Sequence, residues 1–358
     1  MERNFYLAFA SVNGVGPKSF AKLLDHFGSA KLAWNAAESE LEPVLKPKLT
    51  KKFIKARAEF DFDSYLKRLD QLRISYVCLA DKNYPQLLKQ ISDAPIILFC
   101  KGDVRLLSQN YKIAVVGTRH ITSYGREITE MFASGLASQG LVVVSGMAFG
   151  VDGVAHKATI DSGGKTIAVL GNGVDQAYPR ENQKLYEEIL DSGGLIISEY
   201  PPGTPPSVGS FPARNRIVAG LSSGVLVTEG AQDSGSLITA NFALDFSRKV
   251  FAVPGPVTSS LFAAPLRLIE KGAKLVVDPG DVIKELGIKP HELKSNTKQF
   301  ESLTKDEKKI IELIENESLQ FDEIVRRTKL DSSKTATILS MMEIKGLIKS
   351  SGGSYSLG

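Results

Sequence analysis

Cysteine is scarce in this sequence, and its scarcity excludes two ways of stabilising a chain. Of 358 residues only two are cysteines, Cys78 and Cys100, and each lies within an apolar run. Neither has a histidine or another cysteine at the spacing of a zinc site. We therefore expect both to be packing residues in a reducing compartment, with no disulfide and no metal site.

Long apolar runs are also absent. No uninterrupted stretch reaches the roughly 18 residues that a membrane-spanning helix needs. The first residues, MERNFYLAFASVNG, contain neither a basic leader nor a cleavage site of small residues. From these features we expect a cytoplasmic protein with no membrane partner.

A general excess of positive charge is missing as well. The formal net charge is only +4, and the basic excess lies mainly in residues 1–110, whereas residues 111–288 are slightly acidic. If the middle of the chain binds a polyanion, it must do so through a few focused arginines and backbone amides.

The common nucleotide-binding motifs do not occur. The apolar run KIAVV ends in Gly117, Thr118 and Arg119, where a G-x-G-x-x-G fingerprint would bring more glycine, and no G-x-x-x-x-G-K-[ST] is found anywhere. No acidic residue about 20 positions further on ends the second strand, where it would hold a ribose. We expect no nucleotide cofactor, and an arginine in this turn indicates a different phosphate ligand.

The middle of the chain does contain a regular alternation of strands and helices. Six runs rich in Val, Ile and Leu are typical of strands covered on both faces: KIAVV, LVVVS, TIAVL, GLIIS, GVLVT and KVFAV. The pattern predicts an α/β fold over residues 73–288, an extended Rossmann-like, doubly wound and mostly parallel sheet, with two short strands before KIAVV. Ligands of such sheets lie at the carboxyl ends of the strands.

Two smaller domains are expected to flank this sheet. Residues 1–72 predict a helical domain like a SAM or helix-hairpin-helix domain, in which GVGPKSFAKLL is either a DNA-phosphate turn or an ordinary helical turn. Residues 289–302 are polar and predict a linker. Residues 303–358 predict three helices and a hairpin, the pattern of a winged helix. Its third helix offers a DNA groove little beyond Lys334, so protein docking stays open beside DNA recognition.

Glycine, serine and arginine gather where the strands of the middle domain end. Arg119, Arg180, Arg214 and Arg216 are the candidate charges, and Phe211 is able to stack on a base. Arginines beside an aromatic ring suit a chain of phosphates whose bases stack, which describes single-stranded DNA. Some of the glycines have a simpler role in close packing, but a long charged side chain at the mouth of a sheet does not. The predicted contact residues are Gly117, Thr118, Arg119, Ser145, Gly146, Arg180, Phe211, Arg214, Asn215, Ser234, Gly235 and Ser236.

An enzyme is the competing interpretation. Asp152 and His156 are four residues apart on one expected helix, and Glu229 ends a neighbouring strand, so they form a candidate acid–base group for a ribosyl bond. No nucleophile, metal cluster or second carboxylate completes a mechanism, and an Asp in a first helical turn already stabilises the helix dipole. We expect no catalytic residue. A nucleotide-processing hydrolase on a related Rossmann-like scaffold remains the alternative.

Between about Tyr111 and Asp281 the motifs resemble those of the DprA (Smf) family of DNA-processing proteins. Gly117-Thr118-Arg119 falls on its Gly-Ser/Thr-Arg element, Arg180 on its basic residue after Tyr-Pro, and Phe211, Arg214 and Asn215 on its Phe-Pro-x-Arg-Asn element. The chain departs from the family at Ala264-Pro265-Leu266, where members usually carry Gly-x-Asn. The resembling segments are VVGTRHITSYG, VVSGMAFGVDGVAHKATIDSGGKTIAVLGNGVDQAYPREN, SEYPPGTPP, FPARNRIVAGLSSGVLVTEGAQDSGSLITANFALDFSRKVFAVPG and LIEKGAKLV.

The resemblance implies a function as well as a fold. It implies a homodimer that binds single-stranded DNA cooperatively, protects incoming strands and loads the RecA recombinase onto them during natural transformation. It also implies the same flanking domains, a helical one in front and a winged helix behind.

Overall fold

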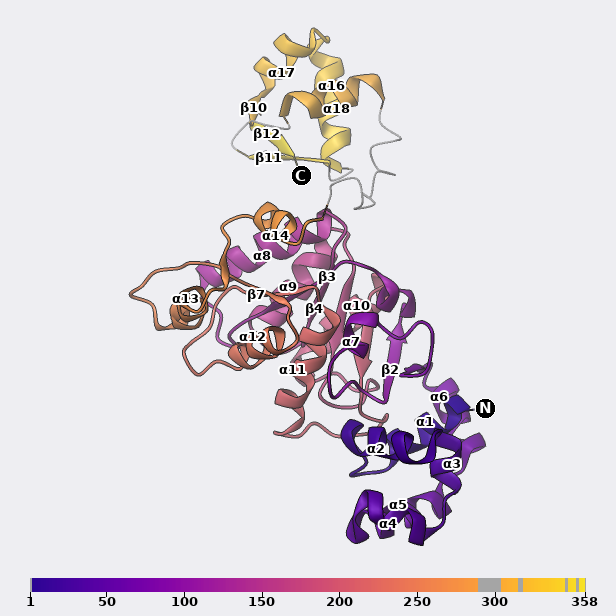
Figure 1. Cartoon of the computed structure of the whole chain (residues 1–358). Helices are drawn as coiled ribbons and strands as arrows, with labels where there is room; N and C mark the ends of the chain where they lie inside the picture. Colours follow the sequence, from indigo (N-terminus) through magenta and orange to yellow (C-terminus); the bar gives the residue numbers. More distant parts are fainter. Residues whose placement is uncertain (1, 289–303, 315–317, 345–346, 352–353, 358) are drawn as a thin grey trace. The chain divides into compact units, whose positions relative to one another are not determined.

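In the computed structural model, the apolar runs of the middle segment pair as strands of one nine-stranded sheet (Figure 1). The strand order is β1-β2-β6-β5-β4-β3-β7-β8-β9; the strands from β6 to β9 are parallel, and β2 and β1 add on antiparallel. This confirms the α/β fold with a mostly parallel sheet. The strands are β1 (Ser75–Cys78), β2 (Ile97–Gly102), β3 (Lys112–Val116), β4 (Val142–Ser145), β5 (Thr166–Val169), β6 (Leu195–Ser198), β7 (Gly224–Val227), β8 (Lys249–Ala252) and β9 (Lys274–Leu275).

The structure describes residues 2–288, 304–314, 318–344, 347–351 and 354–357. Contacts divide the chain into two units, Met1–Leu293 and Lys294–Gly358. The expected boundary between residues 72 and 73 falls inside the first unit and stays a prediction. The expected linker, residues 289–302, lies outside the described residues.

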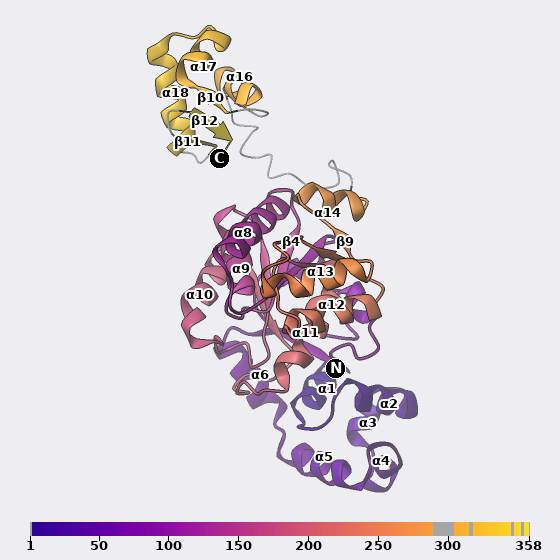
Figure 2. The ribbon, with the colours of Figure 1, turned by 90° about the vertical axis from the view of Figure 1, so that its left-hand side faces the viewer.

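Helices cover both faces of the sheet because side chains alternate along each strand. In β3, Ile113 and Val115 face one helical layer, while Ala114 and Val116 face the other. Figure 2 shows the two layers on opposite sides of the strands. One layer holds α8 (Ser123–Ser138), α9 (Val151–Asp161), α10 (Gln183–Asp191) and α14 (Pro279–Glu285); the other holds α7 (Gln86–Lys89), α11 (Ser210–Leu221), α12 (Gly235–Asp245) and α13 (Ala263–Glu270).

The topology opens a crevice beside β3. This strand lies between β4 and β7, and the helices that follow β3 and β7, α8 and α12, cover opposite faces of the sheet. The two connections therefore part at the carboxyl ends of these strands, which is where open α/β sheets bind ligands. Three short 3₁₀ segments complete the unit's connections: η1 (Val104–Ser108), η2 (Arg180–Asn182) and η3 (Ser260–Phe262).

The front of the chain folds into six helices around an aromatic core. Phe9 stacks on Phe53 with ring centroids 5.2 Å apart, and Trp34 meets Phe9 edge-on at 5.1 Å. The turn before the second helix ends in Gly16, and Pro17 occupies the first helical position, as the sequence predicts. The helices are α1 (Glu2–Ser11), α2 (Pro17–Phe27), α3 (Ala30–Asn35), α4 (Glu38–Leu45), α5 (Pro47–Glu59) and α6 (Phe62–Gln71).

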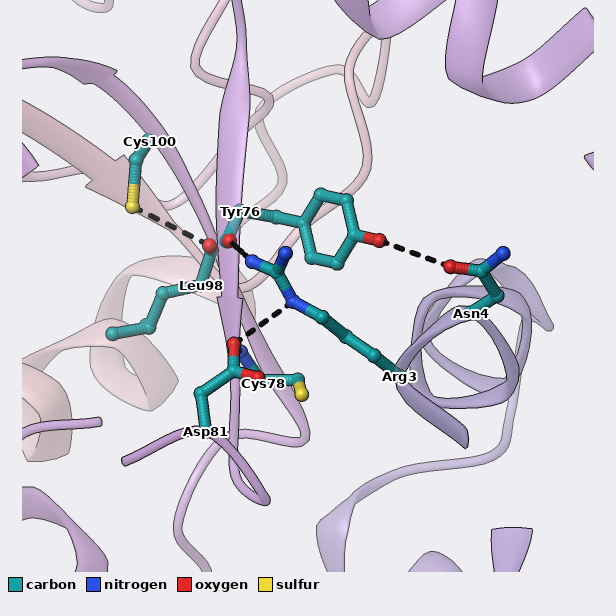
Figure 3. A network of polar contacts seen from close by, with 7 residues as sticks. All are labelled: Arg3, Asn4, Tyr76, Cys78, Asp81, Leu98 and Cys100. Atoms are coloured by element: carbon teal, nitrogen blue, oxygen red, sulfur yellow. Dashed lines mark hydrogen bonds and ion pairs between the residues drawn. The ribbon is translucent and has the colours of Figure 1, made fainter. Parts of the chain in front are cut away.

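Helix α1 is fastened to the antiparallel edge of the sheet (Figure 3). The Arg3 guanidinium lies 4.2 Å from the centroid of the Tyr76 ring, donates to the Tyr76 carbonyl and pairs with Asp81 at 3.0 Å. Asp81 in turn accepts a hydrogen bond from the amide of Cys78 at 2.9 Å. Beneath these contacts the aromatic core of the helices continues into Ile97 and Phe99 of β2.

The second unit has the elements of a winged helix, as expected. Its core includes Ile310, Ile324, Leu339 and Ile348. In the third helix, the Lys334 ammonium pairs with Asp306 at 2.6 Å, so the one basic side chain singled out for a DNA groove already has a partner. The elements are α16 (Lys305–Ile314), β10 (Leu319–Gln320), α17 (Phe321–Thr328), α18 (Ser332–Ile344), β11 (Ile348–Ser351) and β12 (Ser354–Leu357).

Candidate nucleic-acid interface

A cleft of about 580 Å³ lies at the carboxyl ends of the parallel strands, in the crevice beside β3. The loops after β3, β4, β5, β7 and β8 and the start of α11 all contribute to its wall. Segments that are far apart in the sequence therefore meet in one hollow. The predicted contact residues that line it are Gly117, Thr118, Arg119, Gly146, Phe211, Arg214, Asn215, Ser234, Gly235 and Ser236.

Arg119 stands at the rim of this cleft with its side chain exposed. Its guanidinium carbon lies 5.8 Å from the centroid of the Phe211 ring. The turn that carries it rests on the start of α9, where the amide of Val151 donates to the Thr118 carbonyl at 3.1 Å. Gly150, with φ of 75°, makes this approach possible, because a Cβ there would collide with the Thr118 carbonyl oxygen.

Tyr178 is a residue that the sequence analysis did not select. Its ring stacks on Phe211 with centroids 5.1 Å apart and an angle of 23° between the planes, and it remains 39% exposed. The only signal for it was an aromatic residue in the loop after β5, directly before Pro179. We call Tyr178, Phe211 and Arg119 the stacking platform. Its two rings and one cation are the groups on which unpaired bases stack.

Arg214 forms the floor of the cleft. Only 4% of the residue is exposed, and its Nη1 donates to the carbonyl oxygens of Gly146 and Val169. Burial lowers the pKa of the guanidinium, and the nearby Asp152 carboxylate opposes that shift. Arg214 thus ties α11 to the ends of β4 and β5. A phosphate that enters the cleft meets Arg119 first.

The backbone amides that we expected to be open are largely occupied. The Asp152 carboxylate accepts from the amides of Gly146 at 3.2 Å and Ala148 at 3.3 Å, and burial raises its pKa. The amide of Thr118 donates to the Glu229 carbonyl at 2.8 Å. We expected backbone amides to share the phosphate contacts with a few arginines, and these three amides already have partners within the protein.

Three predicted positions lie outside the cleft. Ser145 is fully buried beneath it, where its hydroxyl donates to the Val115 carbonyl at 2.7 Å. Arg216, expected around the crevice, is buried and pairs with Asp93 at 3.1 Å and Glu199 at 2.6 Å. Arg180 is exposed at the start of η2, directly after Pro179, but does not line the cleft. The expected place of Ser145 and Arg216 at the cleft surface is wrong, and Arg180 belongs to its surroundings.

The groups of the enzyme interpretation do not meet in the cleft. Thr166 donates its single hydroxyl proton to the Val143 carbonyl at 2.8 Å, so it accepts from Nδ1 of His156 at 2.6 Å. Nε2 is buried and has no hydrogen-bond partner among the residues that the structure describes. Burial and the nearby Arg214 lower the pKa of His156 to about 3, which leaves the imidazole neutral at pH 7.

Glu229 is likewise engaged elsewhere. Its buried carboxylate accepts from the amide of Thr122 at 3.0 Å and from the Thr122 hydroxyl at 2.7 Å, at the start of α8. Gly125 leaves room for it, because a Cβ there would collide with the carboxylate. In the part of the chain that the structure describes, no cluster of His, Cys, Asp and Glu is arranged to hold a metal ion.

The buried His156 predicts a loss of stability in acid. Its pKa in the folded state, about 3, lies below the ordinary value of about 6.5. Between these two pH values the unfolded chain therefore binds a proton at His156 that the folded protein does not bind. Between about pH 6.5 and pH 3 this group should cost up to about 1.4 kcal/mol of unfolding free energy per pH unit. Urea unfolding at several pH values measures the slope. His156→Gln, which keeps a donor and does not titrate, should flatten it; an unchanged slope would contradict the assignment.

Two protein families match this chain. Residues 75–287 match the family described as "DNA recombination-mediator protein A", and residues 296–354 match the family described as "DprA winged helix domain". The chain belongs to the DNA recombination-mediator protein A family. The DprA resemblance of the motifs is thereby confirmed.

Individual DprA proteins agree with this. The DNA processing protein DprA of Bacillus subtilis is 39% identical over 269 residues, which span 72% of this chain and 90% of that protein. The crystal structure of Streptococcus pneumoniae DprA, 37% identical, superposes with a TM-score of 0.70 over 79% of this chain and 97% of its own. A DprA structure from Helicobacter pylori, whose title describes a unique single-stranded DNA binding mode, is 34% identical with a TM-score of 0.54 over 60% of this chain and 95% of its own.

The departure from the usual DprA pattern has a clear place in the structure. Ala264 and Pro265 are buried in the first turn of α13. The amide of Ala264 donates to the Gly230 carbonyl at 2.9 Å, and the Gly230 amide donates to Leu261 at 2.6 Å. These residues thus hold the loop after β7 beside the cleft.

Among the described residues, no helix is both long and apolar enough to cross a bilayer.

Proposed function

We propose that this protein binds single-stranded DNA in the cleft beside β3, in the cytoplasm, without a cofactor and without catalysing a reaction. The observation that carries the proposal is the stacking platform, an exposed Arg119 over a stacked pair of aromatic rings. A strand of DNA offers the two groups that such a platform binds, a phosphate for the guanidinium and a base for the rings.

The charges around the cleft support a phosphate at Arg119. Arg214 and Asp152 are both buried, and the charge of each counteracts the effect of burial on the pKa of the other. The Arg119 charge adds to the lowering of the Arg214 pKa. The rim arginine is therefore the cation that the cleft leaves to a ligand. Because this is a local charge in a segment that is slightly acidic as a whole, binding should depend on contacts with a few phosphates, not on a broad basic face.

No observation favours the nucleotide-processing hydrolase. His156 and Glu229 are buried among the protein's own groups, and the Asp152 carboxylate is held by two amides. An acid–base mechanism needs a group that reaches the substrate and titrates near neutral pH. We propose accordingly that the protein is not an enzyme.

Family membership supports three further parts of the proposal: assembly as a homodimer, protection of incoming strands, and loading of RecA during natural transformation. For the homodimer there is a structural reason as well. β9 ends the sheet, and Leu275 and the following Val277 leave large apolar side chains exposed there, a surface that a second copy would cover. Sedimentation velocity tests the dimer, and co-purification with RecA tests the second partner.

A competition titration tests the central proposal. A labelled oligothymidine bound to the protein should be displaced by unlabelled single strands, but not by duplex of equal length or by free nucleoside monophosphates. Binding should weaken with salt by about 0.7 log units of affinity per log unit of salt for each phosphate neutralised. Displacement by a nucleoside monophosphate at the same concentration would contradict the proposal, as would release of a free base.

A further inference from the structure

A second groove adjoins the cleft at Arg119. Its volume is about 590 Å³, similar to that of the cleft, and the proposed function so far gives it no ligand. Arg119 and His120 line both hollows, so the two adjoin at the proposed phosphate site. The groove is lined by Arg119, His120, Ile121, Arg126, Phe149 and Gly150.

Phe149 connects the second groove with a small pocket beside the cleft. It lies in the loop between β4 and α9, and 44% of it is exposed. Phe149 lines the second groove and also the small pocket. Tyr178, Phe211 and Arg214 line that small pocket as well as the cleft. Single exposed apolar side chains are common on protein surfaces. This one is distinguished by its place between two hollows, with a ring accessible from both.

Arg126 supplies a second cation in the lining of the second groove. It lies near the start of α8, and its side chain is about half exposed. Its partner, Glu130, is 3.8 Å away and just as exposed, and Glu127 beside it is exposed too. Exposed ion pairs of this kind contribute little to stability, so a DNA phosphate is able to replace the carboxylate.

Rings and cations are thus shared among three adjoining hollows. Tyr178 and Phe211 line the cleft and the small pocket, Phe149 lines the small pocket and the second groove, and Arg126 lines the second groove, while Arg119 lines all three. A single strand presents the matching groups, bases and phosphates, and proteins that bind such strands without regard to sequence combine stacked rings with cations along the backbone. A small metabolite would fill one hollow and leave the other unused.

We propose that the bound strand continues from the cleft over Phe149 into the second groove, with a base stacked on Phe149 and a phosphate beside Arg126. This proposal rests on the proposed function, because it extends the same strand beyond Arg119. It assigns the second groove to single-stranded DNA and makes the binding site longer than the cleft alone.

The test compares a short with a long oligothymidine, of about 6 and about 15 nucleotides, by fluorescence anisotropy. Phe149→Ala should weaken binding of the long strand about tenfold and that of the short strand much less, since only the long strand reaches the second groove. Arg126→Ala should reduce the salt dependence for the long strand by about 0.7 in the log–log slope. Leu32→Ala and Arg105→Ala, which also alter exposed side chains but lie away from both hollows, are matched controls and should change neither strand.

A spectroscopic variant keeps the test independent of affinity. Trp34 is the only tryptophan of the chain and is buried among the front helices. Phe149→Trp therefore adds a fluorescent side chain at the second groove. Its fluorescence should be quenched by the long strand and not by the short one. Equal response to both lengths, together with unchanged long-strand affinity in Phe149→Ala, would overturn the extended path.

The outcomes separate this proposal from the one on which it rests. If Arg119→Ala weakens both strands while Phe149→Ala and Arg126→Ala affect neither, the strand ends in the cleft and the second groove serves another ligand. If the unmodified protein binds neither strand, the proposed function itself is wrong.

Discussion

Replacing Arg119 with alanine is expected to weaken single-strand binding by between about tenfold and about a hundredfold. Hydrogen bonds to a charged group contribute about 1.5–3 kcal/mol, and the guanidinium also covers one face of Phe211. The log–log salt slope should fall by about 0.7, because one phosphate contact is lost. Titrations with oligothymidine at several salt concentrations measure both quantities.

The same variant should fold normally, since the Arg119 side chain is exposed and supports no buried group. Thermal unfolding of Arg119→Ala is therefore expected to match that of the unmodified protein. Arg119→Lys is the informative companion: it keeps the charge and the salt slope but loses the planar group over Phe211, so part of the affinity should remain. Full binding by Arg119→Ala, with an unchanged slope, would refute the assignment of the cleft.

Arg216→Ala should produce the opposite result, a large loss of stability with no direct effect on DNA. Arg216 lies two residues after Arg214 in α11, is buried, and pairs with Asp93 and Glu199. Burial raises the pKa of Glu199, and the Arg216 charge counteracts that rise. Removing the cation leaves a buried carboxylate unpaired, which costs about 3–5 kcal/mol. The midpoint of thermal unfolding should fall by roughly 10 °C.

A second variant shows whether charge is the cause. In Arg216→Met combined with Glu199→Gln the more deeply buried side chain no longer carries a charge, and only Asp93, whose side chain is 28% exposed, keeps one, so much of the lost stability should return. At a temperature where Arg216→Ala is folded, its affinity for oligothymidine should equal that of the unmodified protein. A specific loss of affinity in the folded variant would mean that Arg216 does reach the ligand after all.

The strands and the position of the site were predictable because both depend on local patterns. Short apolar runs of Val, Ile and Leu that alternate with helical stretches are typical of covered strands, and Arg119 lies in the turn after one of them. A strand as short as β9, with Lys274 and Leu275, carries no periodicity and was missed. Tyr178 was missed for a different reason, since its partner Phe211 comes from another loop.

The roles of Arg214 and Arg216 could not be deduced from the sequence. Both lie on α11, and their roles differ because their side chains bind different acceptors. Arg214 finds carbonyl groups at the ends of β4 and β5, whereas Arg216 finds Asp93, which precedes it by more than a hundred positions. Such partners are fixed by the folded sheet and not by spacing along the chain.

The junction at Arg3 has a consequence for how the front of the molecule evolves. The aromatic interior of the first helices runs on into Ile97 and Phe99, so the helices and the sheet edge share one hydrophobic cluster. A homologue that lost these helices would expose apolar side chains along β1 and β2. It would stay soluble only if polar residues replaced those side chains at the same time.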